Sequence, residues 1–242
     1  MDPVTWSRFS LEGTIGAELA PDAVRYGPGL PHEDALKLLG YIEGRRVLEL
    51  GCGSGVTAVA LARAGAKVIA VDQSADALAD TRDAAARHGV RVEAHQGSLA
   101  ELAFVRAETV DAAVSIYGLA AEPDIDRVFR QVHRVLRQDR AFVFALPHPV
   151  FNLLDPEDPE PRLRRRWWDP RPVTWSVGRP DGPPDIPRTL AGLVTSLGRA
   201  NFRIDTVLEP APDQMACPSG WWSDHMAWVP PTLIVRARKE GL

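Results

Sequence analysis

The chain has 242 residues, of which 45% are hydrophobic and 25% are charged, and its formal net charge is −4. This size and composition predict one domain with a full hydrophobic core, and the mild acidity weighs against a nucleic-acid backbone as a partner. The two cysteines, Cys52 and Cys217, give neither a disulfide framework nor a cysteine-rich zinc site, a usage typical of a reducing cytosol.

The predicted elements alternate between helices and strands over most of the chain. Apolar residues at helical spacing indicate the helices, short apolar runs indicate buried strands, and Ser74 and Gly89 are a matched start and stop signal for one helix. In chain order we expect a helix over 34–42, a strand over 47–50, a helix over 56–65, a strand over 67–72, a helix over 74–89, strands over 91–96 and 110–117, a helix over 124–137, a strand over 141–146, a helix over 189–200, and strands over 202–209 and 232–239.

This alternation predicts an α/β fold. Strands joined through helices make right-handed crossovers, so the seven strands should form a doubly wound, Rossmann-like sheet that is mostly parallel. No helix fits between the last two strands, 202–209 and 232–239, and we therefore expect the last strand to be antiparallel to its neighbour.

Proline placement divides this single domain into parts. Only Pro123 falls between residues 32 and 146, whereas 11 of the 21 prolines fall between 147 and 187, a density that regular helices and sheets do not tolerate. The expected parts are an N-terminal segment over 1–31, a core over 32–146, an insertion rich in Pro, Trp and Arg over 147–188, and a C-terminal helix with a strand pair over 189–242.

The stretch RVLELGCGSG, residues 46–55, is a strand followed by a glycine-rich turn and then a helix, an arrangement that binds nucleoside cofactors. A dinucleotide prefers a third glycine where Val56 stands, and Glu49 would repel a pyrophosphate. The same carboxylate can accept hydrogen bonds from an ammonium group, which S-adenosylmethionine carries. The start of the following helix can bind that molecule's carboxylate. The turn therefore favours S-adenosylmethionine over NAD.

Asp72 lies 21 residues after Gly51, at the end of the second strand. A carboxylate in this position can accept hydrogen bonds from both ribose hydroxyls of a bound nucleoside. The alternative is a surface acid that merely flanks the following helix.

The runs VLELGCGSG, VIAVDQS, GSLAEL, VDAAVSIYGLAAEPDIDRVFRQVHRVLR and FALPHPVF occur in this order. With these motifs the sequence resembles class I S-adenosylmethionine-dependent methyltransferases, of the branch similar to ubiquinone- and menaquinone-biosynthesis methyltransferases. The resemblance extends over residues 26–151, and the C-terminal strand pair fits the same fold.

The resemblance implies contacts with S-adenosylmethionine. It would place the glycine turn against the cofactor, Asp72 on the ribose and Gln73 over the adenine, with the N-terminal segment as a lid. At the position where the family usually has an acid for the adenine amino group this chain has Ser98, whose hydroxyl makes a weaker, uncharged hydrogen bond. The full expected set of cofactor-binding residues is Tyr26, Glu49, Gly51, Cys52, Gly53, Ser54, Gly55, Asp72, Gln73, Ser98, Leu99, Ser115 and Ile116.

Methyl transfer needs little catalytic machinery, because the sulfonium already activates the methyl carbon. The protein aligns the acceptor, excludes water and removes a proton where the acceptor carries one. Three residues are candidates for these roles: His148 after the fifth strand, Tyr117 after the fourth, and His225 between the last two. The alternatives are a loop hydrogen bond for His148, no contact with the substrate for His225, and packing against the first helix for Tyr117.

The insertion permits three interpretations. Its arginines at 162, 164, 165 and 166 beside Trp167 and Trp168 could bind a single-stranded nucleic acid, cover the substrate as a flap, or pair with the acids at 155, 157, 158 and 160. Nucleic acid is the least favoured, since the acids cancel the charge. The tryptophans at 167, 168, 175, 221, 222 and 228 would form an apolar, aromatic-binding pocket if they converge.

Three methyltransferase classes lack their motifs here. The chain has no Asn-Pro-Pro-Tyr type of sequence after the fourth strand, no cysteine placed to form a carbon adduct, and no acid and histidine cluster at metal-ligand spacing. No apolar run approaches the roughly 20 residues that span a bilayer, and the first ten residues lack a signal-peptide pattern. We therefore expect a soluble, cytoplasmic protein without a metal site or a membrane partner.

The hypothesis from sequence is an enzyme that transfers a methyl group from S-adenosylmethionine to oxygen, nitrogen or an acidic carbon of a small molecule. The first alternative is a protein that binds S-adenosylmethionine without methylating, which the serine at position 98 keeps open. An NAD-dependent oxidoreductase is the third.

Overall fold

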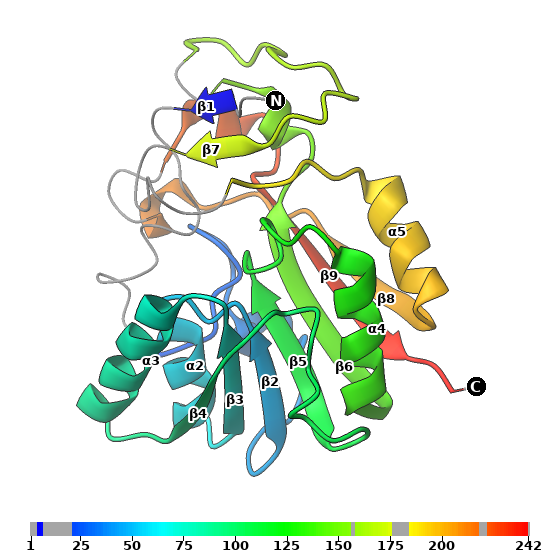
Figure 1. Ribbon diagram of the computed structural model, residues 1–242. Helices are drawn as coiled ribbons and strands as arrows, with labels where there is room; N and C mark the ends of the chain where they lie inside the picture. Colours follow the sequence, from blue (N-terminus) through cyan, green and yellow to red (C-terminus); the bar gives the residue numbers. More distant parts are fainter. Residues whose placement is uncertain (1–3, 7–20, 156–157, 176–183, 218–221, 242) are drawn as a thin grey trace.

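The structure is a computed structural model in which residues 4–6, 21–155, 158–175, 184–217 and 222–241 are described, with the backbone alone for 4–6, 174 and 175 (Figure 1). Its strands are β1 Val4–Trp6, β2 Arg46–Leu50, β3 Lys67–Asp72, β4 Val92–Gln96, β5 Val110–Ile116, β6 Leu136–Pro147, β7 Val173–Trp175, β8 Phe202–Leu208 and β9 Thr232–Lys239. Its α-helices are α1 Glu33–Leu36, α2 Val56–Arg63, α3 Ala75–Arg87, α4 Ile125–Val135 and α5 Leu190–Arg199.

Seven strands form the main sheet, in the order β4-β3-β2-β5-β6-β9-β8. The five strands from β4 to β6 run parallel, and β9 is antiparallel to both of its neighbours, β6 and β8. This confirms the predicted fold class, including the antiparallel last strand. The order reverses between β2 and β5, and ligands of doubly wound sheets bind outside the carboxyl ends of the strands at such a point.

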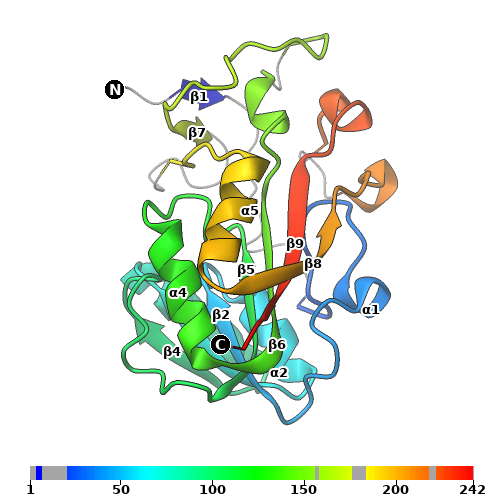
Figure 2. The same ribbon diagram turned by 90° about the vertical axis from the view of Figure 1, so that its right-hand side faces the viewer.

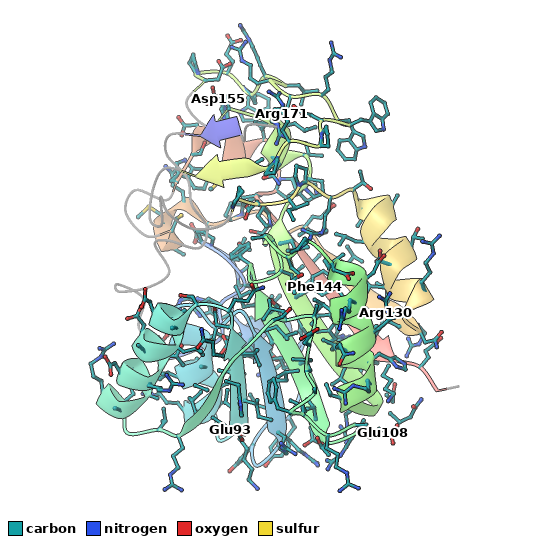
Figure 3. All side chains as sticks on the ribbon, in the orientation of Figure 1. Glu93, Glu108, Arg130, Phe144, Asp155 and Arg171 are labelled. Atoms are coloured by element: carbon teal, nitrogen blue, oxygen red, sulfur yellow. The ribbon has the colours of Figure 1, made fainter. Side chains whose placement is uncertain are left out.

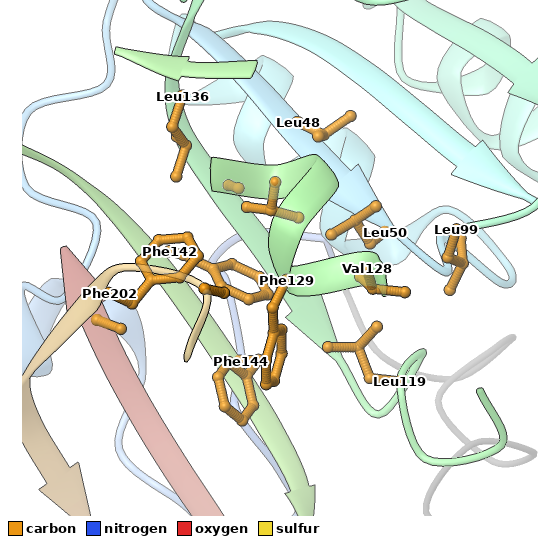
Figure 4. Close-up of a cluster of buried hydrophobic side chains, with 14 of the residues drawn as sticks. Leu48, Leu50, Leu99, Leu119, Val128, Phe129, Leu136, Phe142, Phe144 and Phe202 are labelled. Atoms are coloured by element: carbon orange, nitrogen blue, oxygen red, sulfur yellow. The ribbon is translucent and has the colours of Figure 1, made fainter. Parts of the chain in front are cut away.

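Two helical layers cover the sheet, with α2 and α3 on one face and α4 and α5 on the other (Figures 1 and 2). The pleat of β6 sends alternate side chains to the two layers: Val143 joins the cluster that contains residues of α2, whereas Phe142 and Phe144 join the cluster under α4 and α5. In the second cluster Phe129 of α4 lies 5.9 Å from Phe142 and 5.6 Å from Phe144 between ring centroids (Figure 4). This packing fixes the carboxyl ends of β5 and β6.

The helix predicted over 34–42 is wrong in length. Helix α1 ends at Leu36, because Lys37 adopts a left-handed conformation with φ 52°. The carboxylate of Glu33 then accepts hydrogen bonds from the N–H groups of Leu38 and Leu39, at 3.0 and 2.8 Å. The apolar residues after Leu36 that suggested a longer helix are buried although the chain there is not helical.

A small second sheet was not predicted. Strands β1 and β7 pair in parallel beyond the carboxyl edge of the main sheet, where the insertion also lies (Figure 1). Their three-residue lengths are too short to give a period in the sequence. None of the described helices is long and apolar enough to cross a membrane.

Candidate cofactor and methyl-transfer site

The glycine turn between β2 and α2 lies beside the end of β3. The N–H groups of Gly51 and Cys52 both donate to the carbonyl of Val71, at 2.8 and 3.3 Å. Helix α2 begins after Gly55, whose φ of 82° is left-handed, and no side chain caps it. The N–H groups of its first turn are therefore free of a side-chain cap and can donate hydrogen bonds to an anionic ligand group.

Two of the turn glycines are required by close backbone approaches. A Cβ on Gly51 would come within 2.5 Å of the Cα of Gly118, and a Cβ on Gly55 would come within 2.6 Å of the Cα of Thr81. A Cβ on Gly53, by contrast, would meet no atom within 4 Å among the described residues. The turn is thus packed at both ends and open in its middle.

Asp72, at the end of β3, holds this open part of the turn in place. Its Oδ2 accepts a hydrogen bond from the N–H of Gly53 at 3.0 Å, and its Oδ1 accepts one from the N–H of Ser74 at 2.9 Å. Each carboxylate oxygen has a further lone pair, so the group can also accept hydrogen bonds from a ligand diol.

Glu49 is buried near the end of β2 with only 2% of its surface exposed. Its Oε2 has no hydrogen-bond partner among the described residues. Burial raises the pKa of this carboxyl well above the usual glutamate range, and the negative charge of Asp72 raises it further. A buried acceptor without a partner is costly, and a ligand ammonium group would satisfy it.

The loops on the adenine side are linked to each other. The side-chain amide of Gln73 donates to Oε2 of Glu122 at 3.4 Å, and that of Gln96 donates to the carbonyl of Gln73 at 3.2 Å. The hydroxyl of Ser98 accepts a hydrogen bond from the N–H of Ala100 at 3.2 Å, which leaves it one lone pair and its proton.

Several expected cofactor residues have side chains that point into the protein. Leu99 packs in the core cluster, and Ser115 is fully buried, with its hydroxyl donating to the carbonyl of Leu50 at 2.7 Å. The thiol of Cys52 is buried, which raises its pKa, and it accepts a hydrogen bond from Thr81. Such residues can contact a cofactor only through their backbone. Ile116 and Ser54 are partly exposed, in keeping with a place beside it.

The N-terminal segment packs against the ends of β5 and β9. Tyr26 is fully buried, and its hydroxyl donates to Oε2 of Glu33 at 2.6 Å. A Cβ on Gly27 would lie 2.4 Å from the hydroxyl oxygen of Tyr117. In this conformation the Tyr26 hydroxyl is directed to its own segment. Residues 7–20 of the predicted lid lie outside the described residues.

His148 is buried at the end of β6 with both ring nitrogens engaged. Its Nδ1 accepts a hydrogen bond from the N–H of Val150 at 3.1 Å, and its Nε2 lies 2.9 Å from Oε1 of Glu209. An accepting Nδ1 requires the proton of the neutral ring to be on Nε2, which therefore donates to Glu209. In this geometry neither ring nitrogen has a free lone pair that could take a proton from the molecule to be methylated.

Tyr117 is also fully buried, and φ of 58° places its backbone in the left-handed region. Its hydroxyl shares a hydrogen bond of 2.6 Å with that of Thr232, the first residue of β9. Burial raises the pKa of the phenol, so it stays protonated at neutral pH. The residue ties the loop after β5 to β9 and is not set up as a base.

His225, in the short helix of residues 224–227, is buried, and its Nδ1 has no hydrogen-bond partner among the described residues. The next residue, Met226, belongs to the same apolar cluster as Tyr26 and Tyr117. Of the three catalytic candidates, His225 is the one with an unengaged ring nitrogen.

The insertion pairs its charges internally. Arg162 contacts Glu160 at 2.5 Å, Arg164 contacts Asp158, and the carboxylate of Asp169 binds Arg171 at 2.5 Å. This part of the molecule, marked by Asp155 and Arg171 in Figure 3, lies beyond the carboxyl edge of the sheet. These ion pairs neutralise arginines of the insertion that could otherwise contact a nucleic acid.

The tryptophans do not all converge. Trp167 and Trp168 line one cavity, Trp222 donates to Asp224, and Trp228 is exposed. Trp221 and the side chain of Trp175 lie outside the described residues.

Comparison with known proteins agrees with this geometry. Residues 47–139 match a family described as a methyltransferase domain. A crystal structure of an S-adenosylmethionine-dependent methyltransferase from Mesorhizobium loti superposes with a TM-score of 0.70 at 27% identity, over 85% of this chain and 96% of that one. The glycine turn and strands β3, β4 and β5 lie within this matched range. Residues 47–139 form a class I S-adenosylmethionine-dependent methyltransferase domain.

Two curated relatives are similar to parts of the chain. A ubiquinone biosynthesis O-methyltransferase from Bordetella avium (strain 197N) is 36% identical over 122 residues, which cover 46% of this chain and 51% of that protein. A cypemycin N-terminal methyltransferase from Streptomyces sp is 35% identical over 140 residues, which cover 57% of this chain and 52% of that protein. The chain spans about half the length of the curated relatives it matches.

The cofactor that this methyltransferase domain implies, S-adenosylmethionine, fits the residues present. The unpartnered Oε2 of Glu49 suits its ammonium group, and the uncapped start of α2 suits its carboxylate. The open side of Gly53 leaves room beside the carboxylate of Asp72, which suits the ribose. A dinucleotide fits less well, because its pyrophosphate would lie close to two carboxylates.

Sequence reasoning missed several residues that build the methyltransferase site. Gly118 is one, since a Cβ there would come within 2.4 Å of the carbonyl oxygen of Leu50. A glycine directly after a strand end was the available signal. Glu122, Glu209 and Thr232 gave none, because each acts through a partner far away in the sequence.

Proposed function

We propose that this protein transfers a methyl group from S-adenosylmethionine to an oxygen, nitrogen or acidic carbon of a small molecule, without a metal ion. The observation that carries the proposal is the buried carboxyl of Glu49, whose Oε2 has no partner among the described residues, beside a glycine turn that Asp72 holds in place. When bound, the cofactor supplies a methyl carbon activated by a sulfonium.

The residues divide the work of binding. Glu49 would bind the ammonium group of the methionine part, and the first turn of α2 would bind its carboxylate. Asp72 would accept hydrogen bonds from the ribose hydroxyls, and Gln73 and Ser98 would border the adenine. Ser98 can accept one hydrogen bond from the adenine amino group through its remaining lone pair.

We further propose His225 as the group that takes the acceptor's proton. Its Nδ1 is free, whereas His148 uses both nitrogens for Val150 and Glu209. The roles left to His148 and Tyr117 are positional: His148 fixes the loop after β6, and Tyr117 fixes the loop after β5 through Thr232. A proton transfer of this kind contributes about 10²–10⁴-fold to a rate.

The nature of the acceptor is part of this proposal. One relative is named for an O-methyltransferase and another for an N-terminal methyltransferase, so both atoms are represented among similar proteins. The self-paired arginines of the insertion favour a small molecule over a nucleic acid.

The test is transfer of an isotope-labelled methyl group from S-adenosylmethionine into a metabolite extract. We expect label in at least one metabolite with the wild-type protein and much less with Asp72→Ala. Absence of transfer together with tight cofactor binding would support the second candidate, a protein that binds S-adenosylmethionine without methylating. The uncharged Ser98 at the adenine position is the observation that favours this second candidate.

A further inference from the structure

A cavity of about 200 Å³ lies between the loop after β6, residues 165–170 of the insertion, and the start of α5. Its lining includes Pro149, Asn152, Arg165, Trp167, Trp168 and Arg188. None of the residues assigned above to S-adenosylmethionine lines it. It is therefore a separate feature of the molecule, and a cavity of roughly 150 Å³ already holds a benzene ring in other proteins.

The polar side of this cavity is fixed in position but incompletely satisfied. Arg165 is 6% exposed, and its terminal nitrogens donate to the carbonyls of Asn152 and Arg171, at 3.5 and 2.5 Å. The Nε–H of Arg165 has no hydrogen-bond partner among the described residues, with Asp169 no nearer than 3.6 Å. The side-chain Oδ1 of Asn152, also 6% exposed, has none either.

These two atoms need hydrogen-bond partners of opposite kinds. The Nε–H of Arg165 needs an acceptor, and the Oδ1 of Asn152 needs a donor. Unpaired buried polar atoms cost free energy, and such atoms on two residues that line one cavity favour a ligand that brings both groups.

The charge of the cavity lining is positive. Arg165 and Arg188 line the cavity together with one acid, Asp169, whose carboxylate is bound by Arg171 at 2.5 to 3.0 Å and lies 3.6 Å from Nε of Arg165. Asp185 and Glu122, outside the lining, offset part of the charge of Arg188. Burial lowers the pKa of Arg165, and the neighbouring charge of Asp169 only partly opposes this shift. An anionic ligand group would complete the site.

The remaining wall is aromatic. Trp167 and Trp168 are adjacent in the chain and line the cavity, yet Trp168 is 86% exposed. A large indole left in water at a cavity is typical of a surface that stacks on a planar ligand.

We propose that this cavity binds a planar aromatic carboxylate that carries an N–H or O–H donor beside its acid group. The carboxylate accepts from the Nε–H of Arg165, the ring donor meets the Oδ1 of Asn152, and the ring stacks on Trp168. This site goes beyond the proposed methyl transfer and does not depend on it.

The experiment uses the fluorescent probe 2-aminobenzoate on the full chain, with its neutral analogue 2-aminobenzamide as the charge control. We expect saturable binding of the acid and about tenfold weaker binding of the amide, because charge-assisted hydrogen bonds are the stronger ones. Cyclohexanecarboxylate, which has the charge without the planar ring, should compete poorly.

The variant Trp168→Ala should weaken 2-aminobenzoate binding by about two- to tenfold, the range for one aromatic partner. The matched control is Trp228→Ala, since Trp228 is 73% exposed and does not line the cavity. Both substitutions remove exposed rings, so the fold should be unaffected. Saturating S-adenosylmethionine should leave probe binding unchanged.

Four outcomes would overturn the proposal. They are no saturable binding up to the solubility of the probe, equal binding of acid and amide, equal effects of the two tryptophan variants, and displacement of the probe by S-adenosylmethionine. The last would place the probe in the cofactor site. Failure of methyl transfer leaves all four readouts intact, so the two proposals are tested separately.

Discussion

The carboxyl group of Glu49 is buried close enough to Asp72 for the charge of Asp72 to add to burial in raising the Glu49 pKa. These two acids lie at the ends of neighbouring parallel strands, β2 and β3. In the proposed site, Glu49 would bind a cation and Asp72 would bind a diol. Without the cofactor they oppose each other, and a bound ammonium group would relieve that repulsion.

The first prediction concerns Glu49→Gln. The folded pKa of Glu49 lies above the unfolded value, so the folded state holds its proton more tightly. Its contribution to stability is therefore most favourable below the usual glutamate pKa, and declines as pH rises toward the folded value. Glu49→Gln should raise the Tm of the ligand-free protein at neutral pH, by about 2–4 °C for each kcal/mol relieved. At acidic pH the difference should disappear.

The same variant should bind S-adenosylmethionine more weakly, because the amide cannot pair with the ammonium charge. Thermal denaturation over a pH series and calorimetric titration measure the two effects. A Tm difference that is constant with pH, or cofactor affinity equal to that of the wild type, would contradict the role given to Glu49.

The second prediction concerns the contact between the turns after β2 and β5. Gly118→Ala would place a Cβ 2.4 Å from the carbonyl oxygen of Leu50, a backbone atom that cannot rotate away. We expect a loss of about 1–3 kcal/mol in the free energy of unfolding, as for other overpacked sites. The control is Gly198→Ala in α5, where a Cβ meets no atom of the described residues within 4 Å and helix propensity predicts a gain of up to about 1 kcal/mol. Equal denaturation midpoints for the two variants would show that the close approach is wrong.

The third prediction separates the two histidines. His225→Gln should lower kcat by about 10²-fold or more while leaving the Kd for S-adenosylmethionine unchanged, because it removes a base and no cofactor contact. His148→Ala should mainly lower Tm, since it breaks the hydrogen bonds to Val150 and Glu209. Labelled methyl transfer and thermal denaturation of both variants provide the measurements. An inactive His148→Ala of normal Tm beside an active His225→Gln would reverse the assignment.

The sheet could be predicted from sequence because its strands are contiguous apolar runs punctuated by glycines and caps. Ser74, expected to cap α3, does accept a hydrogen bond from the N–H of Ala77 at 3.2 Å. The prediction of a helix over 34–42 was wrong because the carboxylate of Glu33 accepts hydrogen bonds from the N–H groups of Leu38 and Leu39, where the chain turns. The spacing of apolar residues carries no sign of such a contact. Strands β1 and β7 were not predicted because each has three residues and pairs with a segment 169 residues away, as Val4 does with Val173.

The cofactor turn and Asp72 were visible because they lie in short, ordered motifs. The catalytic candidates were not separable from sequence, because the state of each ring depends on distant partners. From the sequence His148 was a candidate base or a residue that hydrogen-bonds a loop, and its Nε2 contacts Glu209, which is 61 residues away in the chain. Likewise, the sequence of the insertion could not show that Arg165 lines a cavity with Trp167 and Trp168 while Arg162 and Arg164 pair with acids.

The measurement that tests the central claim most directly is calorimetric titration of the wild type and of Asp72→Ala with S-adenosylmethionine and with NAD. The exposed Asp76, in the first turn of α3, supplies the control variant Asp76→Ala. We predict that the wild type and Asp76→Ala bind S-adenosylmethionine equally and NAD not measurably. Asp72→Ala should bind S-adenosylmethionine about 10- to 100-fold more weakly, the value of hydrogen bonds to a charged group. Unchanged affinity in Asp72→Ala, or a preference for NAD, would contradict the site.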